Sequence, residues 1–175
     1  AGEFVYSPSV DGEDSVWTQD GLLLRADDPA PGAPGQFSSF NSRPQMLPDG
    51  TAVWVGGLTN SVGGATQARA LFRAADTATP VITIVLQSGD MVGGFPIDFP
   101  SGVAFDYQFS DDGAHHIQTL LLDTGSTTND DVVYVDGAVV ARELSPVPGG
   151  LPGENWDNFD NVSINSAGDY LFSGD

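Results

Sequence analysis

The sequence predicts an all-β protein made of three four-stranded antiparallel units, a β-propeller-like array that is partial or is completed by oligomerisation. Apolar runs are short and rich in β-branched and aromatic residues, as in Val81 to Leu86. Asp-Gly, a strong hairpin signal between such runs, occurs five times. Landmark motifs return about every 50 to 60 residues. Four short strands in roughly 50 residues is the size of one propeller blade.

Each unit contains four candidate strands in the same order. The first follows a glycine, and the second centres on an aromatic residue: Trp17, Phe72 or Tyr134. The third leads into a recurrent Arg-to-Gly segment and covers residues 22–25, 81–87 or 138–142. The fourth lies among apolar residues before the next glycine and covers residues 37–40, 103–109 or 156–164.

The spacing of two landmarks defines the repeat. Four glycines open the first strands: Gly2, Gly50, Gly113 and Gly168. The second landmark starts at Arg25, Gln87 and Arg142, and from these to the next glycine is 25, 26 and 26 residues. Because one half of each unit keeps its length, we expect a single repeat domain over 1–175. Its units are about 1–49, 50–112 and 113–167, with a surplus first strand at 168–175.

One segment has two interpretations. Residues 64–76 (GATQARALFRAAD) are alanine-rich and by propensity alone would form a short helix. In register with the other units, Leu71 and Phe72 belong to a strand. We predict a strand, since pairing with neighbouring strands overrides a weak local propensity.

Charge and composition exclude several classes of protein. The chain has 24 acidic residues and 5 basic ones, with no cysteine. Nucleic acid and anionic membranes would be repelled, and disulfides and a cysteine nucleophile are impossible. No apolar run approaches the roughly 18 residues of a membrane span. The absence of a signal-peptide pattern and of an initiator methionine suggests a mature or excised piece.

The motif residues resemble a known repeat family. Asn165 to Phe172 (NSAGDYLF) resembles the NxxGxxAF tandem repeat of secreted bacterial proteins, and residues 25–32 and 142–149 resemble the REGDPAPG segment that alternates with it. Leu47 and Ser110 depart by replacing the asparagine. The resemblance implies a propeller-like array on a secreted or surface-anchored protein, with no established enzymatic activity to transfer. Within the motif, we expect the glycine to adopt positive φ and the asparagine to bind the turn backbone.

Acidic loop residues are the candidate metal ligands, because hard cations prefer carboxylate oxygens. The most suitable are Asp157 and Asp160, which lie near an aromatic residue, and the group Asp11, Glu13 and Asp14. Calcium is the only cofactor expected. The alternative is that the acidic residues form a solvated surface.

Catalytic motifs are absent from the sequence. It has no Gly-x-Ser-x-Gly elbow, no phosphate loop and no lysine. Adjacent strand residues point to opposite faces, so His115 and His116 cannot easily bind one metal ion.

We therefore expect a non-enzymatic extracellular or cell-surface structural module that associates with itself through strand edges, as a ring or a filament. Three alternatives stay open: a carbohydrate- or ligand-binding propeller module, a fragment of a longer propeller, and a polysaccharide-active enzyme with paired carboxylates. The expected partners are further copies of the chain or a polysaccharide, and not nucleic acid.

Overall fold

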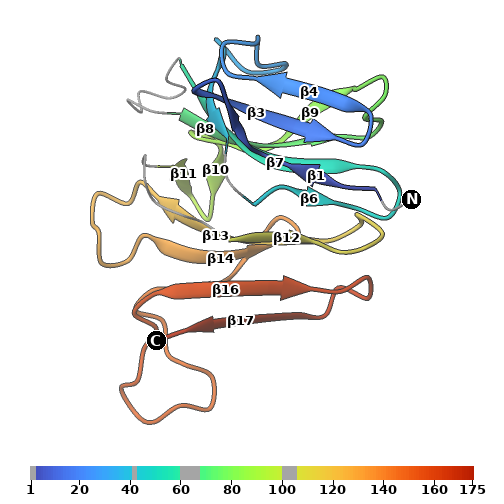
Figure 1. Ribbon diagram of the computed structural model, residues 1–175. Coiled ribbons are helices and arrows are strands. Elements are labelled where there is room, and N and C mark those ends of the chain that lie inside the picture. Colours follow the sequence, from blue (N-terminus) through green and yellow to red (C-terminus); the bar gives the residue numbers. More distant parts are fainter. Residues whose placement is uncertain (1–2, 41–42, 60–67, 100–105) are drawn as a thin grey trace. The chain divides into compact units, whose positions relative to one another are not determined.

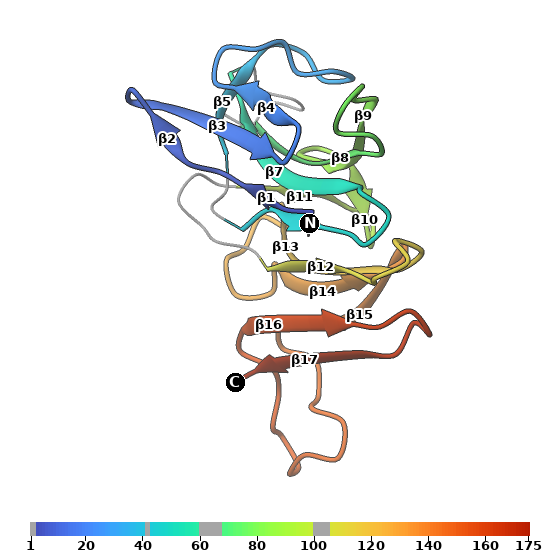
Figure 2. The ribbon, with the colours of Figure 1, turned by 45° about the vertical axis from the view of Figure 1, so that its right-hand side comes forward.

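The computed structural model describes residues 3–40, 43–59, 68–99 and 106–175 (Figures 1 and 2). Every regular element in these residues is a β-strand, and all strand pairs are antiparallel, so the all-β prediction is confirmed. Within the described part there is no helix with the length and apolar character needed to cross a membrane. The chain divides into two compact units, Ala1–Gly89 and Asp90–Asp175.

Unit 1 contains two sheets. In the first sheet, β3 has β1 and β2 on one edge and β4 on the other. In the second sheet, β7 has β5 and β6 on one edge and β8 on the other, and β9 follows β8. The strands are β1 (Val5–Tyr6), β2 (Ser9–Val10), β3 (Glu13–Thr18), β4 (Gly21–Arg25), β5 (Phe37–Phe40), β6 (Gln45–Met46), β7 (Ala52–Leu58), β8 (Ala68–Ala74) and β9 (Ile82–Gln87).

Unit 2 contains one large sheet and one strand pair. In the large sheet, β13 has β11 and β12 on one edge and β14 on the other, with β10 beyond β11 and β15 beyond β14. The pair is β16 with β17. The strands are β10 (Met91–Val92), β11 (Phe95–Asp98), β12 (Tyr107–Phe109), β13 (His116–Leu122), β14 (Asp131–Val135), β15 (Ala138–Arg142), β16 (Phe159–Ile164) and β17 (Tyr170–Gly174).

The ambiguous alanine-rich segment forms a strand where the structure describes it. Residues 68–74 are β8, which pairs with β7 along its whole length and with β9 on its other edge. Ala70, Leu71 and Phe72 are completely buried. Burial on both faces of a central strand outweighs the small helix preference of alanine. The strand prediction is therefore confirmed for residues 68–74, and residues 64–67 lie outside the described part.

The three predicted four-stranded units are not confirmed, because strands pair across the expected boundaries. β5 was expected to end the first unit, but it pairs with β7, and β16 likewise pairs with β17. The reason lies in the glycines. Gly50, Gly113 and Gly168 have φ of 83°, 66° and 80°, and each donates its backbone N–H to the carbonyl three residues earlier, at 2.8–3.0 Å. Each glycine thus sits in a hairpin turn, which joins neighbouring strands of one sheet.

The turn chemistry agrees with the expected role of the motif. The Asn165 side-chain oxygen accepts hydrogen bonds from the backbone N–H groups of Ala167 (2.9 Å) and Asp169 (3.0 Å). In the preceding copy, Ser110 accepts a hydrogen bond from the His115 N–H at 3.0 Å. The serine hydroxyl therefore replaces the asparagine amide in closing the turn.

Both copies of the Arg-to-Gly segment fold alike. The Ser145 backbone N–H donates a hydrogen bond to the Arg142 carbonyl, and the Asp28 N–H donates to the Arg25 carbonyl in the same way. Isolated bridges then close both loops, at Pro29 with Gln36 and at Pro146 with Asn155. The sequence repeat is therefore a repeat of backbone structure, although the sheets are divided differently from the prediction.

Candidate interaction surface

The first sheet of unit 1 has one covered face and one open face. Side chains alternate along β3, so Val16 and Thr18 are buried at 0% and 4% exposure. Val16 belongs to the core cluster that includes Trp54 and Phe72 of the second sheet. Trp17, next to Val16, points to the opposite face and is only partly buried. This second face is the candidate interaction surface.

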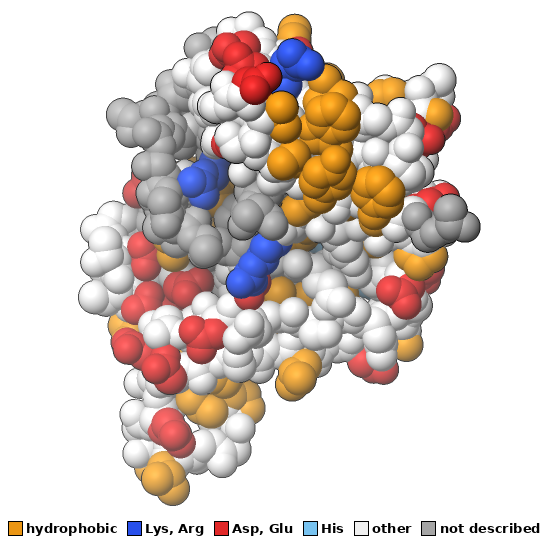
Figure 3. Space-filling model, viewed as in Figure 1, with side chains coloured by type: hydrophobic (Ala, Val, Ile, Leu, Met, Phe, Trp, Pro, Cys, Tyr) orange, Lys and Arg blue, Asp and Glu red, His pale blue; other side chains and the backbone are white. Residues whose placement is uncertain are grey.

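A row of large apolar side chains crosses the open face. Tyr6 of β1 lies directly opposite Trp17 of β3, and Trp17 lies opposite Leu22 of β4. We call these three residues the outer row. Tyr6 and Leu22 are 46% and 38% exposed, and the Phe4 ring lies 5.7 Å from the Tyr6 ring. Figure 3 shows apolar side chains gathered over β1, β3 and β4.

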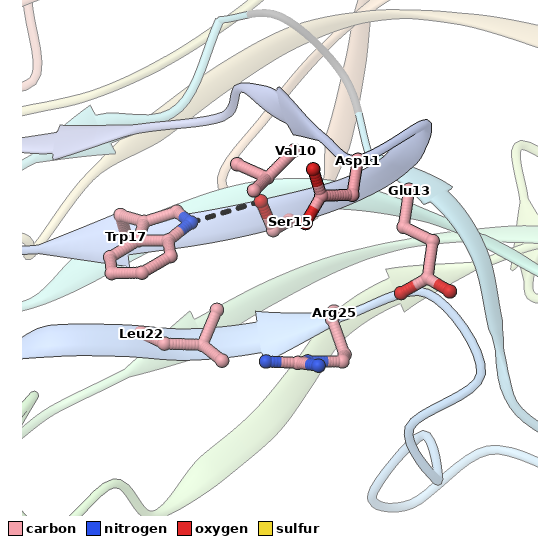
Figure 4. Close-up of a pocket in the computed structure, with 7 residues that line it drawn as sticks. All are labelled: Val10, Asp11, Glu13, Ser15, Trp17, Leu22 and Arg25. Atoms are coloured by element: carbon pink, nitrogen blue, oxygen red, sulfur yellow. Dashed lines mark hydrogen bonds between the residues drawn. The ribbon is translucent and has the colours of Figure 1, made fainter.

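A shallow groove of about 250 Å³ continues the outer row along β3 and β4. Trp17 and Leu22 lie at one end, and Glu13 and Arg25 lie at the other (Figure 4). The Trp17 indole N–H donates a hydrogen bond to the Ser15 hydroxyl at 2.9 Å. Because this hydrogen bond holds the ring in place, the groove has a pre-oriented aromatic wall.

The second sheet carries an equivalent row on the face that is buried in the core of unit 1. Trp54 lies opposite Phe72, and Phe72 lies opposite Ile84. We call these residues the inner row. Trp54 and Phe72 are completely buried and stack at 5.8 Å. In both sheets the central aromatic residue follows a bulge, between Val16 and Trp17 or between Leu71 and Phe72. The outer row thus has the side-chain type and register of a row that the same fold buries elsewhere.

The predicted calcium ligands do not converge. Asp11 and Glu13 line the groove, but Asp14 is the next residue along β3 and points to the other face. Asp157 precedes β16, and Asp160 is an exposed residue within it. Among the residues that the structure describes, no three acidic or histidine side chains are grouped to hold a metal ion. Calcium binding stays a prediction.

The two histidines lie in different environments: His116 begins β13, and His115 directly precedes that strand. The His115 ring lies 2.6 Å from the Asp136 carboxylate and is one-third exposed. The His116 ring stacks on the Phe109 ring at 5.3 Å and lies tilted to the Tyr134 ring at 6.0 Å, and burial lowers its pKa. Asp136 also accepts the His116 backbone N–H at 2.7 Å. The sequence marked Asp136 only as part of an Asp-Gly turn.

Unit 2 contains an acidic pair, Asp131 and Glu143, whose proximity the sequence spacing does not predict. Glu143 is buried and accepts the Asp130 N–H at 3.2 Å, and burial raises its pKa. Asp131 accepts the Phe159 N–H at 3.2 Å. Burial, with the nearby Glu143 charge, raises the Asp131 pKa to about 6. Asp131 therefore loses its proton at a clearly higher pH than an ordinary aspartate.

Asp131→Asn is expected to stabilise the protein at neutral pH. The raised pKa means that the folded state favours the protonated carboxyl over the carboxylate. The contribution of Asp131 to the free energy of unfolding is therefore fully present below about pH 4 and is lost as the pH rises from about 4 to 6. The asparagine amide carries no charge, so this loss does not occur, and its side-chain oxygen can still accept a hydrogen bond from the Phe159 N–H. We expect the free energy of unfolding to rise by about 1–2 kcal/mol at pH 7.5, a value discounted for partial solvation of the carboxyl. At pH 4 we expect almost no rise. Denaturant unfolding at the two pH values measures it. A gain of equal size at both would contradict the assignment.

These features define an all-β protein with an internal repeat and an open aromatic sheet face. The chain belongs to the DUF7453 family, a family of unknown function whose profile matches residues 4–175. Comparison with curated proteins and with solved structures found no match.

Proposed function

We propose that this chain is a non-enzymatic structural and interaction module of the extracellular space, with propeller-blade-like repeat sheets, and that its copies associate through strand edges. The observation that carries the proposal is the open edge of β17. The equivalent first strands β7 and β13 have partners on both edges, whereas β17 pairs within the described residues only with β16. An open edge presents unpaired backbone N–H and C=O groups to another chain.

The pairing pattern supports blade-like units that are completed across repeat boundaries. A fourth strand joins the first strand of the next repeat at β5–β7, β12–β13 and β16–β17. Two of these first strands continue into second and third strands, as β7–β8–β9 and β13–β14–β15. Among the described residues, no second or third strand follows in the β16–β17 sheet. Strands of another copy could therefore extend it in the same way.

The charge of the chain predicts how such association depends on salt. With a formal net charge of −19, two copies repel each other at low ionic strength. Salt screens this repulsion with a Debye length of about 10 Å at 0.1 M, and more strongly at higher salt. Association should therefore strengthen as salt is added.

Sedimentation velocity at low salt and at about 0.5 M salt tests the proposal. We expect oligomers that increase with salt and with protein concentration. Leu171→Lys, in β17 at a side chain 73% exposed, should shift the protein toward monomer, since lysine protects edges. Leu151→Lys is the matched control, because Leu151 is 77% exposed in a loop and the change in charge is identical. A wild-type protein that stays monomeric under all conditions would refute self-association.

A further inference from the structure

The groove beside the outer row combines apolar and charged side chains. Trp17 and Leu22 form its apolar end, and the charged end carries Asp11, Glu13 and Arg25. Figure 4 shows the Arg25 guanidinium pointing along β4 toward Leu22, on the side of the sheet where the Trp17 ring lies. A ligand that fills the groove therefore contacts an aromatic ring and charges of both signs.

The charges decide which ligands fit the groove. An anionic ligand would be repelled by the net charge of −19 and by the carboxylates of Asp11 and Glu13. A cationic ligand would meet the Arg25 guanidinium inside the groove. A purely apolar ligand would remove water from three charged groups without replacing their hydrogen bonds, which is costly. The groove is therefore suited to an uncharged ligand that carries polar groups.

The charged side chains require both hydrogen-bond donors and acceptors from that ligand. The carboxylates of Asp11 and Glu13 only accept hydrogen bonds, and the Arg25 guanidinium only donates them. All three side chains are exposed, and among the described residues none of them is paired with another side chain. A sugar hydroxyl both donates and accepts without carrying a charge. Neighbouring hydroxyls of one sugar ring can therefore bind both kinds of group.

The aromatic side chains of this face provide a fixed contact. The Trp17 indole N–H donates to the Ser15 hydroxyl at 2.9 Å, and that hydroxyl donates to the Pro8 carbonyl at 3.0 Å. Ser15 is only 3% exposed, so its position is set by the sheet. Tyr6 adds a second ring, 46% exposed, directly opposite Trp17. Because the Trp17 ring is held before binding, little of its conformational entropy is lost when a ligand packs on it.

The extent of the surface favours a short chain of sugars over a single one. The outer row crosses three neighbouring strands, which lie about 5 Å apart, so it spans about 10 Å. The groove volume of about 250 Å³ lies below the usual range of enclosed small-molecule sites. A ligand therefore lies along this face instead of being enclosed by it.

We infer that the outer row and its groove bind an uncharged oligosaccharide. The C–H face of a sugar ring packs on Trp17 and Tyr6. Its hydroxyls donate to the carboxylates of Asp11 and Glu13 and accept from the Arg25 guanidinium. This site lies on the first sheet of unit 1, whereas the proposed self-association uses the edge of β17, so either one can fail without the other.

Isothermal titration calorimetry with six-sugar chains tests the inference. The uncharged probes are hexamers of glucose, xylose, mannose, galactose and N-acetylglucosamine, which differ in the placement of their polar groups. Titrations are made at low salt, where the proposed self-association is weakest, and are repeated at about 0.5 M salt. We expect a hexamer to bind with an affinity that changes less than about twofold with salt, because the ligand has no charge to screen. If no hexamer binds at concentrations up to about 5 mM, the inference is wrong.

Single substitutions locate the site. Tyr6→Ala, Trp17→Ala and Arg25→Gln should each weaken binding by about tenfold or more, because each removes a ring contact or a charged hydrogen bond. Tyr170→Ala is the matched control for Tyr6→Ala, since Tyr170 is 45% exposed and its ring likewise lies beside a phenylalanine ring, that of Phe172. It should leave the affinity unchanged. Thermal melting verifies that each variant is folded.

Two further probes separate an uncharged sugar from other ligands. A galacturonate hexamer is negatively charged and should bind more weakly than the uncharged hexamers at low salt. A capped hexaserine peptide carries hydroxyls on a flexible backbone and should not bind. Tighter binding of either probe would assign the groove to a charged ligand or to a peptide. Sugar binding that Tyr6→Ala and Trp17→Ala leave intact, or that Tyr170→Ala weakens equally, would place the sugar elsewhere and overturn the assignment of the outer row.

Discussion

Replacing Phe72 with alanine is expected to lower the free energy of unfolding by about 3–5 kcal/mol. Phe72 is completely buried, stacks on Trp54 and contacts the Phe37 ring edge-on. Neighbouring strands hold the surrounding side chains, so the space cannot collapse around alanine. Urea unfolding at about pH 7 and 0.5 M salt measures the loss.

Trp17→Ala is the matched control at the same position of the outer row. The ring faces the open side and makes one side-chain hydrogen bond, to Ser15. We expect a loss of about 1 kcal/mol or less in a monomeric protein. If Trp17→Ala costs as much as Phe72→Ala at a concentration where the chain is monomeric, the outer row is covered within the chain and is not an open face.

The second large effect is expected at Gly56 in the middle of β7. A β-carbon there would lie 2.8 Å from two atoms of the Phe37 ring and 3.2 Å from the Phe72 ring. Because both rings are fully buried, neither can move aside without displacing the core. Gly56→Ala should therefore cost about 1–3 kcal/mol through overpacking.

Gly57→Ala provides the neighbouring control. Its β-carbon would meet only the hydroxyls of Ser38 and Ser39 at short distance, and these can rotate away. We expect less than about 1 kcal/mol, because alanine also reduces the entropy of the unfolded chain. Equal thermal melting temperatures for the two variants would contradict the close approach of Phe37 to β7.

Much of the fold was predictable because local signals and strand pairing agree. Apolar runs beside Asp-Gly turns gave strands at the expected places, including β8, where register overrode alanine propensity. The division into sheets was not predictable from spacing alone. A glycine before a strand can mark the start of a unit or the turn of a hairpin, and only the 2.8–3.0 Å turn hydrogen bonds at Gly50, Gly113 and Gly168 distinguish the two.

The candidate surface was only partly visible in the sequence. Trp17 and Phe72 were placed at equivalent positions, but exposure depends on whether another sheet lies against the row, which no local pattern encodes. The calcium candidates failed to converge because strand alternation separates Glu13 from Asp14. The raised pKa of Asp131 arises from burial beside Glu143, twelve residues away, and has no sequence signature.

Sedimentation velocity at low salt and at about 0.5 M salt tests the proposed self-association most directly. Wild type, Leu171→Lys in β17 and the loop control Leu151→Lys are compared at the same protein concentrations. The account predicts that wild type and Leu151→Lys form oligomers at the higher salt, whereas Leu171→Lys stays closer to monomer. A wild type that is monomeric under every condition, or equal association of the two variants, would contradict it.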